Sequence, residues 1–107
     1  METIKVAGSS RTGAVAGAIA GVVRDHHRAV VQAIGAGAVN QALKALILAT
    51  GYLKIDDIFV SFVPEFAEVS IEDHVRTAIR FVIEPSSTSD FSALRLSTRA
   101  KLVDTPV

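Results

Sequence analysis

The spacing of apolar residues along this chain alternates between the β-strand period and the helical period, which limits the folds it can adopt. Each of the first two short apolar runs is followed by a longer, glycine- and alanine-rich segment with helical spacing. The first helix is expected from about Gly13 to His26. The second is expected from about Ala36 to Thr50, with Gly51 as a left-handed C-cap. Its core-facing residues are expected to be Val39, Leu43, Leu46 and Ile47, and its outward-facing residues Asn40, Gln41 and Lys44. The expected strands cover residues 3–7, 29–35, 56–66 and 75–85.

This order of elements, β-α-β-α-β-β, predicts an α+β fold built on a four-stranded mixed sheet. The two helices are long enough to be the crossover connections that parallel strands need. The last two strands are close enough in sequence for a hairpin around residues 68–74. Both helices are expected on one face of the sheet, because four strands do not hide two apolar faces here. The other face would carry Lys5, Gln32, Arg76 and Arg80.

Composition limits the possible functions. A chain of 107 residues, half of them hydrophobic, suits one domain with an aliphatic core. Its 11 basic and 11 acidic side chains cancel, so any binding to nucleic acid or an anionic membrane would need a local patch. The absence of cysteine excludes disulfides and thiolate chemistry. The uncharged run of residues 12–23 is too short to span a bilayer. No signal-peptide pattern precedes the first strand, so a cytoplasmic protein is expected.

Three glycines recur at every fourth position of the first expected helix, at Gly13, Gly17 and Gly21. Each costs roughly 1 kcal/mol relative to alanine in a helix interior. Their spacing places them on one face, where small residues let another backbone approach closely. We therefore expect this stripe to pack tightly against the sheet or the neighbouring helix.

The turn that opens the second helix contains Gly35 and Gly37. A dinucleotide-binding turn needs a third glycine where this chain has Asn40, and no P-loop lysine follows, so a nucleotide cofactor is not expected. The turn still leaves free backbone amides that can hold a phosphate, with Asn40 and Lys44 on the outward face of the helix. The alternative is that the two glycines only allow a tight turn against the sheet.

Residues with catalytic chemistry are scattered. His26 and His27 are adjacent on a helix, point in different directions and make a poor metal pair, and His74 stands alone. The acidic residues near the hairpin have no nucleophile or metal ligands beside them. The sequence therefore predicts no catalytic residues, no metal site and no cofactor, and a chain that is not an enzyme.

Three blocks of the sequence resemble a known family. They are "IKVAGSSRTGAVAGAIAGVVR", "VQAIGAGAVNQALKALILATGYL" and "RTAIRFVIEP", and they look like the signature blocks of the bacterial stage V sporulation protein S family. That family is placed with the Alba-like nucleic-acid-binding proteins, whose fold is β-α-β-α-β-β with both helices on one sheet face. The resemblance therefore implies the same fold and a regulatory role in sporulation or related development, through DNA or RNA.

The resemblance also implies which residues bind nucleic acid. In this sequence they are Arg11 in the loop after the first strand, the turn with Gly35, Gly37 and Asn40, Lys44 on the second helix, and Arg76 at the exit of the hairpin. Arg80, farther along the last strand, is expected to add a further phosphate contact. The hairpin, which would enter a groove of the nucleic acid, carries acidic residues here. Alba-like proteins commonly pair, so a homodimer or higher homo-oligomer is expected. The exposed-looking Leu48 and Tyr52 could form its seam.

The chain is expected to divide into an Alba-like domain over residues 1–85 and a C-terminal extension over residues 86–107. The extension is an extra strand, an arm onto a partner subunit or disordered, and its apolar spacing fits a strand and a helix equally. The leading interpretation is a regulator that binds DNA or RNA weakly and with low sequence specificity. The alternative is a protein-interaction module of the same fold, which the zero net charge favours.

Overall fold

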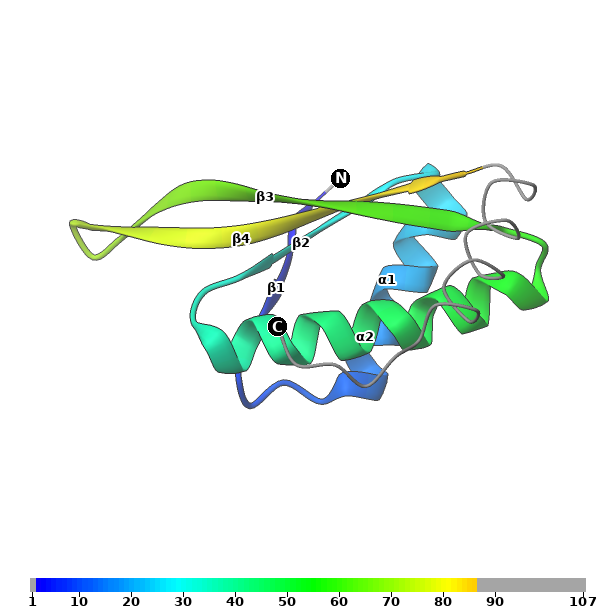
Figure 1. Cartoon of the computed structure of the whole chain (residues 1–107), viewed down its shortest axis with the longest axis horizontal. Helices are drawn as coiled ribbons and strands as arrows, with labels where there is room; N and C mark the ends of the chain where they lie inside the picture. Colours follow the sequence, from blue (N-terminus) through cyan, green and yellow to red (C-terminus); the bar gives the residue numbers. More distant parts are fainter. Residues whose placement is uncertain (1, 87–107) are drawn as a thin grey trace, which may run out of the picture.

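The computed structural model describes residues 2–86, which form two helices and a four-stranded sheet (Figure 1). The elements are β1 (Ile4–Val6), α1 (Thr12–His26), β2 (Ala29–Ala33), α2 (Ala36–Ile55), β3 (Val60–Ile71) and β4 (His74–Pro85). The spatial order of the strands is β1-β2-β4-β3, with β1 and β2 parallel and the other neighbours antiparallel. The predicted α+β class, element order and mixed sheet are confirmed.

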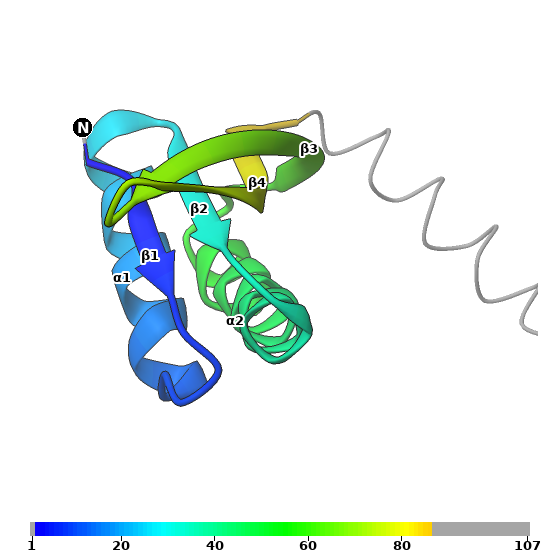
Figure 2. The same cartoon turned by 90° about the vertical axis from the view of Figure 1, so that its left-hand side faces the viewer.

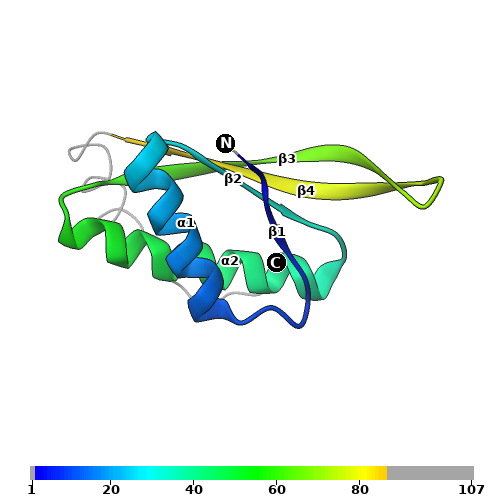
Figure 3. The same ribbon diagram turned by 180° about the vertical axis from the view of Figure 1, so that it is seen from behind.

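The helices form one layer and the sheet forms the other. Both α1 and α2 lie on the same side of the sheet, as predicted, and within residues 2–86 no helix covers the opposite face, which we call the open face (Figures 1 and 3). Seen from the end, α1 and α2 lie beside each other beneath β1 and β2 (Figure 2). The outer end of the β3–β4 hairpin projects beyond both helices, so neither α1 nor α2 lies beneath it (Figure 1).

The strand register assigns each side chain to one face, because side chains alternate along a strand. One row across the sheet contains Lys5, Gln32, Arg80 and Glu65, which lie on the open face. The next row contains Val6, Ala33, Ile79 and Phe66, which lie on the face that meets the helices. The predicted polar face is therefore confirmed.

The helices meet through alanines and not through the glycine stripe of α1. The buried helix residues include Ala16, Ala20, Ala38, Ala42, Ala45 and Ala49. A Cβ placed on Gly13, Gly17 or Gly21 would meet no atom from elsewhere in residues 2–86 within 4 Å. The expectation that this stripe packs on the sheet or on α2 is wrong. Ile19 and Val23 are buried on the other side of α1, so the glycines lie on the side away from the core.

The second helix is longer than its sequence signals indicate. Gly51 lies inside α2 instead of capping it, and the helix continues to Ile55 with Asp56 as its C-cap. The physical reason is the burial of Leu53, which is completely buried in the extra helical turn. Burying this side chain stabilises the fold by more than one glycine inside a helix destabilises it. The same helix corrects a second expectation, because Leu43 and Ile47, expected in the core, are exposed.

The hairpin is tighter and longer than expected. The third strand begins at Val60 instead of residue 56 and runs to Ile71, because Asp56 and Asp57 still belong to the end of α2. The turn consists only of Glu72 and Asp73, which both have positive φ, as a two-residue type I′ turn requires. The predicted extension over residues 86–107 lies, apart from Ser86, outside the described residues.

Candidate functional site

The loop between β1 and α1 lies against the start of α2. The backbones of Gly8 and Gly37 approach so closely that a Cβ on Gly8 would be 3.7 Å from the carbonyl carbon of Gly37. Gly35, the N-cap of α2, has φ +91°, a conformation that L-residues with side chains rarely adopt. The second helix therefore begins at a sharp corner that requires a glycine at residue 35.

One side chain of α2 joins these two segments. Gln41 donates hydrogen bonds from Nε2 to the carbonyl oxygen of Ser10 at 2.7 Å and to Oγ1 of Thr12 at 3.2 Å. The Nζ of Lys44 in turn donates to Oε1 of Gln41 at 3.4 Å. The loop is also closed on itself, because the backbone amide of Ala7 donates to Oγ of Ser10 at 2.8 Å. A continuous set of hydrogen bonds therefore runs from the loop to Lys44.

This set of bonds holds the first residue of α1, Thr12, against Gln41 in the second turn of α2. Arg11 is the N-cap of α1, and its side chain is exposed and makes no capping hydrogen bond. At the start of α2, Gly35, Gly37 and Asn40 are exposed, and neither helix has an acidic residue in its first turn. We call Arg11, Gly35, Gly37, Asn40 and Lys44 the helix-end site.

The electrostatics of the helix-end site favour an anion. Each helix N-terminus carries unpaired N–H groups and the positive end of the helix dipole, which together equal roughly half a charge. The N-terminus of α1 is held against the second turn of α2, and the cations Arg11 and Lys44 add to the positive charge of the helix ends. The site is exposed, so it can contact a large ligand directly.

The other two predicted contacts lie elsewhere. Arg80 is on the open sheet face, where its Nε and Nη2 donate to Oε1 of Gln32, both at 3.2 Å. Arg76 is on the same face but farther out, opposite Val69 in the part of the hairpin that extends beyond β2. The structure therefore groups Arg11 with Lys44 and places Arg76 and Arg80 on the side of the sheet away from the helices.

Negative charge surrounds this second pair of arginines. Glu65 lies opposite Arg80 in the register, and the hairpin turn consists of Glu72 and Asp73. Arg80 is also only partly exposed. Its guanidinium donates hydrogen bonds to the side chain of Gln32, the one buried polar side chain among the described residues. Acidic side chains therefore offset the positive charge of Arg76 and Arg80 more than that of the helix-end site.

Sequence reasoning missed the role of Gln41, which was expected only to face outward. Its spacing of three residues from Lys44 was a visible signal, because side chains three or four residues apart meet on a helix surface. The contact with Ser10 could not be anticipated, because it joins residues 31 positions apart.

Other kinds of site find no support in the described part of the chain. Within residues 2–86, no three histidine, aspartate or glutamate side chains gather where they could hold a metal ion. Neither α1 nor α2 combines the length and hydropathy of a membrane-spanning helix.

The fold and the site together define a small α+β domain with an exposed, positively charged helix end. The comparison with protein families is more specific. A family described as stage V sporulation protein S matches residues 2–86, which is all of the described domain. The chain belongs to this family, and it is therefore a sporulation-related protein. The resemblance seen in the three sequence blocks is confirmed.

Proposed function

We propose that this protein is a non-enzymatic regulator that binds the phosphate backbone of DNA or RNA through the helix-end site. The observation that carries the proposal is the link from Thr12 through Gln41 to Lys44, which holds the N-terminus of α1 and its cation Arg11 beside the first turns of α2 and Lys44. Helix N-termini and basic side chains are both common phosphate ligands. Membership of a sporulation-related family supports a regulatory role for such binding.

The proposed binding is weak and sensitive to salt. Each phosphate neutralised by a cation releases counterions, and log K changes with log salt by about −0.9 for each such contact on duplex DNA. Arg11 and Lys44 supply two cations per chain at this site, which predicts a slope of about −2 for one chain.

Low sequence specificity follows from the side chains available. Reading bases directly needs several side chains that pair with base edges in a groove. The helix-end site offers only Asn40 as an exposed amide beside its two cations. Backbone contacts position a protein on nucleic acid but carry little sequence information.

Arg76 and Arg80 remain predicted contacts, on a second surface. They lie across the sheet from the helices, so a short nucleic acid on the helix-end site does not reach them. Their part would be to hold a longer strand or a second molecule. The acidic turn beside Arg76 opposes phosphate, which makes this surface the weaker of the two.

The test is a titration of fluorescently labelled single- and double-stranded DNA and RNA, followed by anisotropy at about 50 and 200 mM salt. Arg11→Ala/Lys44→Ala is expected to abolish most of the salt-dependent binding. The matched control is Arg24→Ala/Arg28→Ala, which removes the same number of cations from two exposed surface ion pairs, with Asp56 and Glu84, outside the helix-end site. Absence of wild-type binding at low salt contradicts the proposal, as does an equal loss in both double variants.

A second candidate function rests on a different observation. Phe66 is 82% exposed and Ile47 is 67% exposed, although both are strongly hydrophobic. Large exposed apolar groups mark surfaces that bind other proteins. A protein-interaction module is therefore the alternative, and wild-type protein that binds none of the nucleic acids would favour it.

A further inference from the structure

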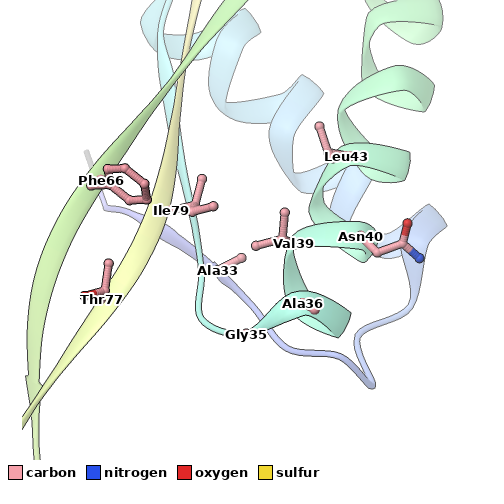
Figure 4. A pocket seen from close by; sticks show the side chains of 9 residues that line it. All are labelled: Ala33, Gly35, Ala36, Val39, Asn40, Leu43, Phe66, Thr77 and Ile79. Carbon is pink, nitrogen blue, oxygen red and sulfur yellow. The ribbon is translucent and has the colours of Figure 1, made fainter. Parts of the chain in front are cut away.

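The two faces of the sheet carry different hollows. The face that meets the helices has an apolar groove, where Ala33 and Ile79 point toward α2 and Phe66 lies beside them (Figure 4). The open face has a separate hollow of about 370 Å³ at the ends of β1 and β2. A hollow of this size can hold a small molecule, because ligand pockets in proteins span about 300–1,000 Å³. Its lining includes Lys5, Gln32, Ile34, Val69, Ser70 and Ile71.

The β3–β4 hairpin supplies one wall of this hollow. The hairpin twists toward the β1 side of the sheet (Figure 2), which brings Val69 and Ile71 to the same hollow as Lys5. Ala78 lies on the open face, because it alternates with Ile79, and it is completely buried although neither α1 nor α2 covers this face. The open face is therefore concave here, with β3 on one side and β1 and β2 on the other.

A buried amide with a fixed orientation lies in this hollow. Gln32 is 7% exposed and lies in register between Lys5 of β1 and Arg80 of β4. The Nε and Nη2 groups of Arg80 both donate to its Oε1 at 3.2 Å. A guanidinium has no acceptor, so the oxygen of the amide faces Arg80 and its nitrogen, Nε2, faces away.

The nitrogen of this amide is unpaired. Nε2 of Gln32 donates to no group within residues 2–86. No completely enclosed side-chain nitrogen or oxygen of these residues lacks a partner, so Nε2 is open to solvent. Gln32 lines the hollow, so this is where its N–H groups meet solvent. Because buried polar groups are normally paired, an amide held on one side and unpaired on the other is a donor available to a ligand.

The charge beside this donor is positive. Lys5 is the neighbour of Gln32 in the register of β1 and β2, is exposed and forms no ion pair within residues 2–86. No acidic side chain of the described chain lines the hollow, since neither Glu65 nor the two residues of the hairpin turn reach it. One cation and one amide donor together favour a negatively charged oxygen group.

The rest of the lining is mainly apolar. Ile34 follows β2 in the chain, and Val69 and Ile71 lie on β3, where Ile71 is 42% exposed. Covering apolar surface with an apolar group is favourable, because it removes both from water. A ligand that matches the whole hollow therefore has one anionic end and an apolar body.

We propose that this hollow binds a small carboxylic acid with an apolar body. Its carboxylate accepts hydrogen bonds from Nε2 of Gln32 and Nζ of Lys5. Its body lies against Ile34, Val69 and Ile71. A carboxylate matches the single lysine of the lining better than a phosphate monoester does, because the phosphate carries a charge of about −1.5 to −2 and three acceptor oxygens.

This site is separate from the helix-end site. Neither Arg11 nor Lys44 lines the hollow, and the open face lies across the sheet from both helices. The carboxylate proposal therefore does not rest on the binding of nucleic acid, and each of the two proposals can fail by itself.

The first test is a titration of the isotope-labelled full chain, followed by the amide signals in nuclear magnetic resonance spectra. The probes are hexanoate, hexanol and hexyl phosphate. Hexanoate is expected to bind with a Kd of about 1–10 mM, as a small fragment does. The signals that move are expected to be those of Lys5, Gly8 and Val69 and the side-chain amide of Gln32. Hexanol, which has no charge, is expected to bind about fivefold more weakly.

The second test uses variants of the two donors. Gln32→Glu keeps an acceptor for Arg80 but replaces the N–H groups with a carboxylate oxygen, so it is expected to fold and to weaken hexanoate binding at least about tenfold. Lys5→Gln, at an exposed position, is expected to weaken it about fivefold. The control is Arg11→Ala/Lys44→Ala, which is expected to leave hexanoate binding unchanged.

Four results overturn the proposal. They are the absence of saturable shifts with hexanoate, equal binding of hexanoate and hexanol, tighter binding of hexyl phosphate than of hexanoate, and shifts centred on the helix-end site. Unchanged hexanoate affinity of a folded Gln32→Glu variant also overturns it. If that variant does not fold, Lys5→Gln decides, and unchanged affinity there has the same consequence.

Discussion

The side-chain amide of Gln41 on α2 donates a 2.7 Å hydrogen bond to the backbone carbonyl oxygen of Ser10, 31 residues earlier in the chain. This bond connects the loop before α1 to the first turns of α2, and it supports the loop residue next to Arg11. The geometry of the helix-end site therefore depends on a side chain that is itself neutral.

Gln41→Ala is expected to cost about 1–2 kcal/mol of unfolding free energy, because it removes two hydrogen bonds that are partly buried. Urea denaturation followed by circular dichroism measures this loss. The control is Asn40→Ala at the neighbouring exposed position, which is expected to change stability by less than about 0.5 kcal/mol. Equal effects of the two substitutions would show that the bonds of Gln41 do not hold the loop.

Gly17→Ala in α1 is expected to stabilise the fold by up to about 1 kcal/mol, because alanine favours a helix and nothing else in residues 2–86 lies within 4 Å of the new Cβ. Gly35→Ala is expected to do the opposite, since residue 35 has φ +91°. Thermal unfolding of both variants compares them directly. If Gly17→Ala destabilises the protein, then the glycine face of α1 packs against something other than residues 2–86 of its own chain.

Leu53→Ala is expected to destabilise the fold by about 2–5 kcal/mol, because Leu53 is completely buried beyond Gly51. Leu48→Ala is the matched control on the same helix, where the side chain is 40% exposed and the expected cost is smaller. Denaturant unfolding measures both. Similar small losses would mean that α2 ends near Gly51 after all.

Glu72→Asn/Asp73→Gly is expected to stabilise the hairpin by about 1 kcal/mol, because both turn residues have positive φ and Asn-Gly is the preferred pair for this turn. The change also removes two negative charges near Arg76. Binding of nucleic acid is expected to strengthen if Arg76 makes a contact. Unchanged affinity, with the expected rise in thermal stability, would remove the hairpin from the interface.

Asp56→Asn is expected to cost less than about 1 kcal/mol. The carboxylate pairs with Arg24 at 2.8 Å and joins the ends of the two helices, but both side chains are nearly half exposed. Solvent weakens such pairs, and salt weakens them further. Unfolding at about 0.05 and 1 M salt measures the effect, and a loss above about 2 kcal/mol would contradict this view of the pair.

Much of the architecture could be predicted because apolar periodicity reports which side of an element is buried. The alternation in β4 correctly separated Arg76 and Arg80 from Phe81 and Ile83. The helix boundaries were less predictable. Gly51 is a strong local stop signal, yet the burial of Leu53 outweighed it, and such burial is a property of the whole fold.

The candidate site was predictable in part. Lys44 and the turn at Gly35 are close in sequence, so their proximity follows from helix geometry alone. The addition of Arg11 to this group depends on the contact between Gln41 and the loop, which no local pattern encodes. The placement of Arg76 and Arg80 on the far side of the sheet from this group likewise required the folded chain.

By itself, the sequence determined the two layers, the order of the strands and helices and the family, because these depend on local periodicity and on recognisable blocks of residues. Only the tertiary structure decided that alanines join the helices while the glycines of α1 face outward. It also decided that Phe66 stands uncovered beside a groove and that the basic residues divide between two surfaces. The physical reason is that these features depend on contacts between residues far apart in the chain, whose distances no local pattern contains.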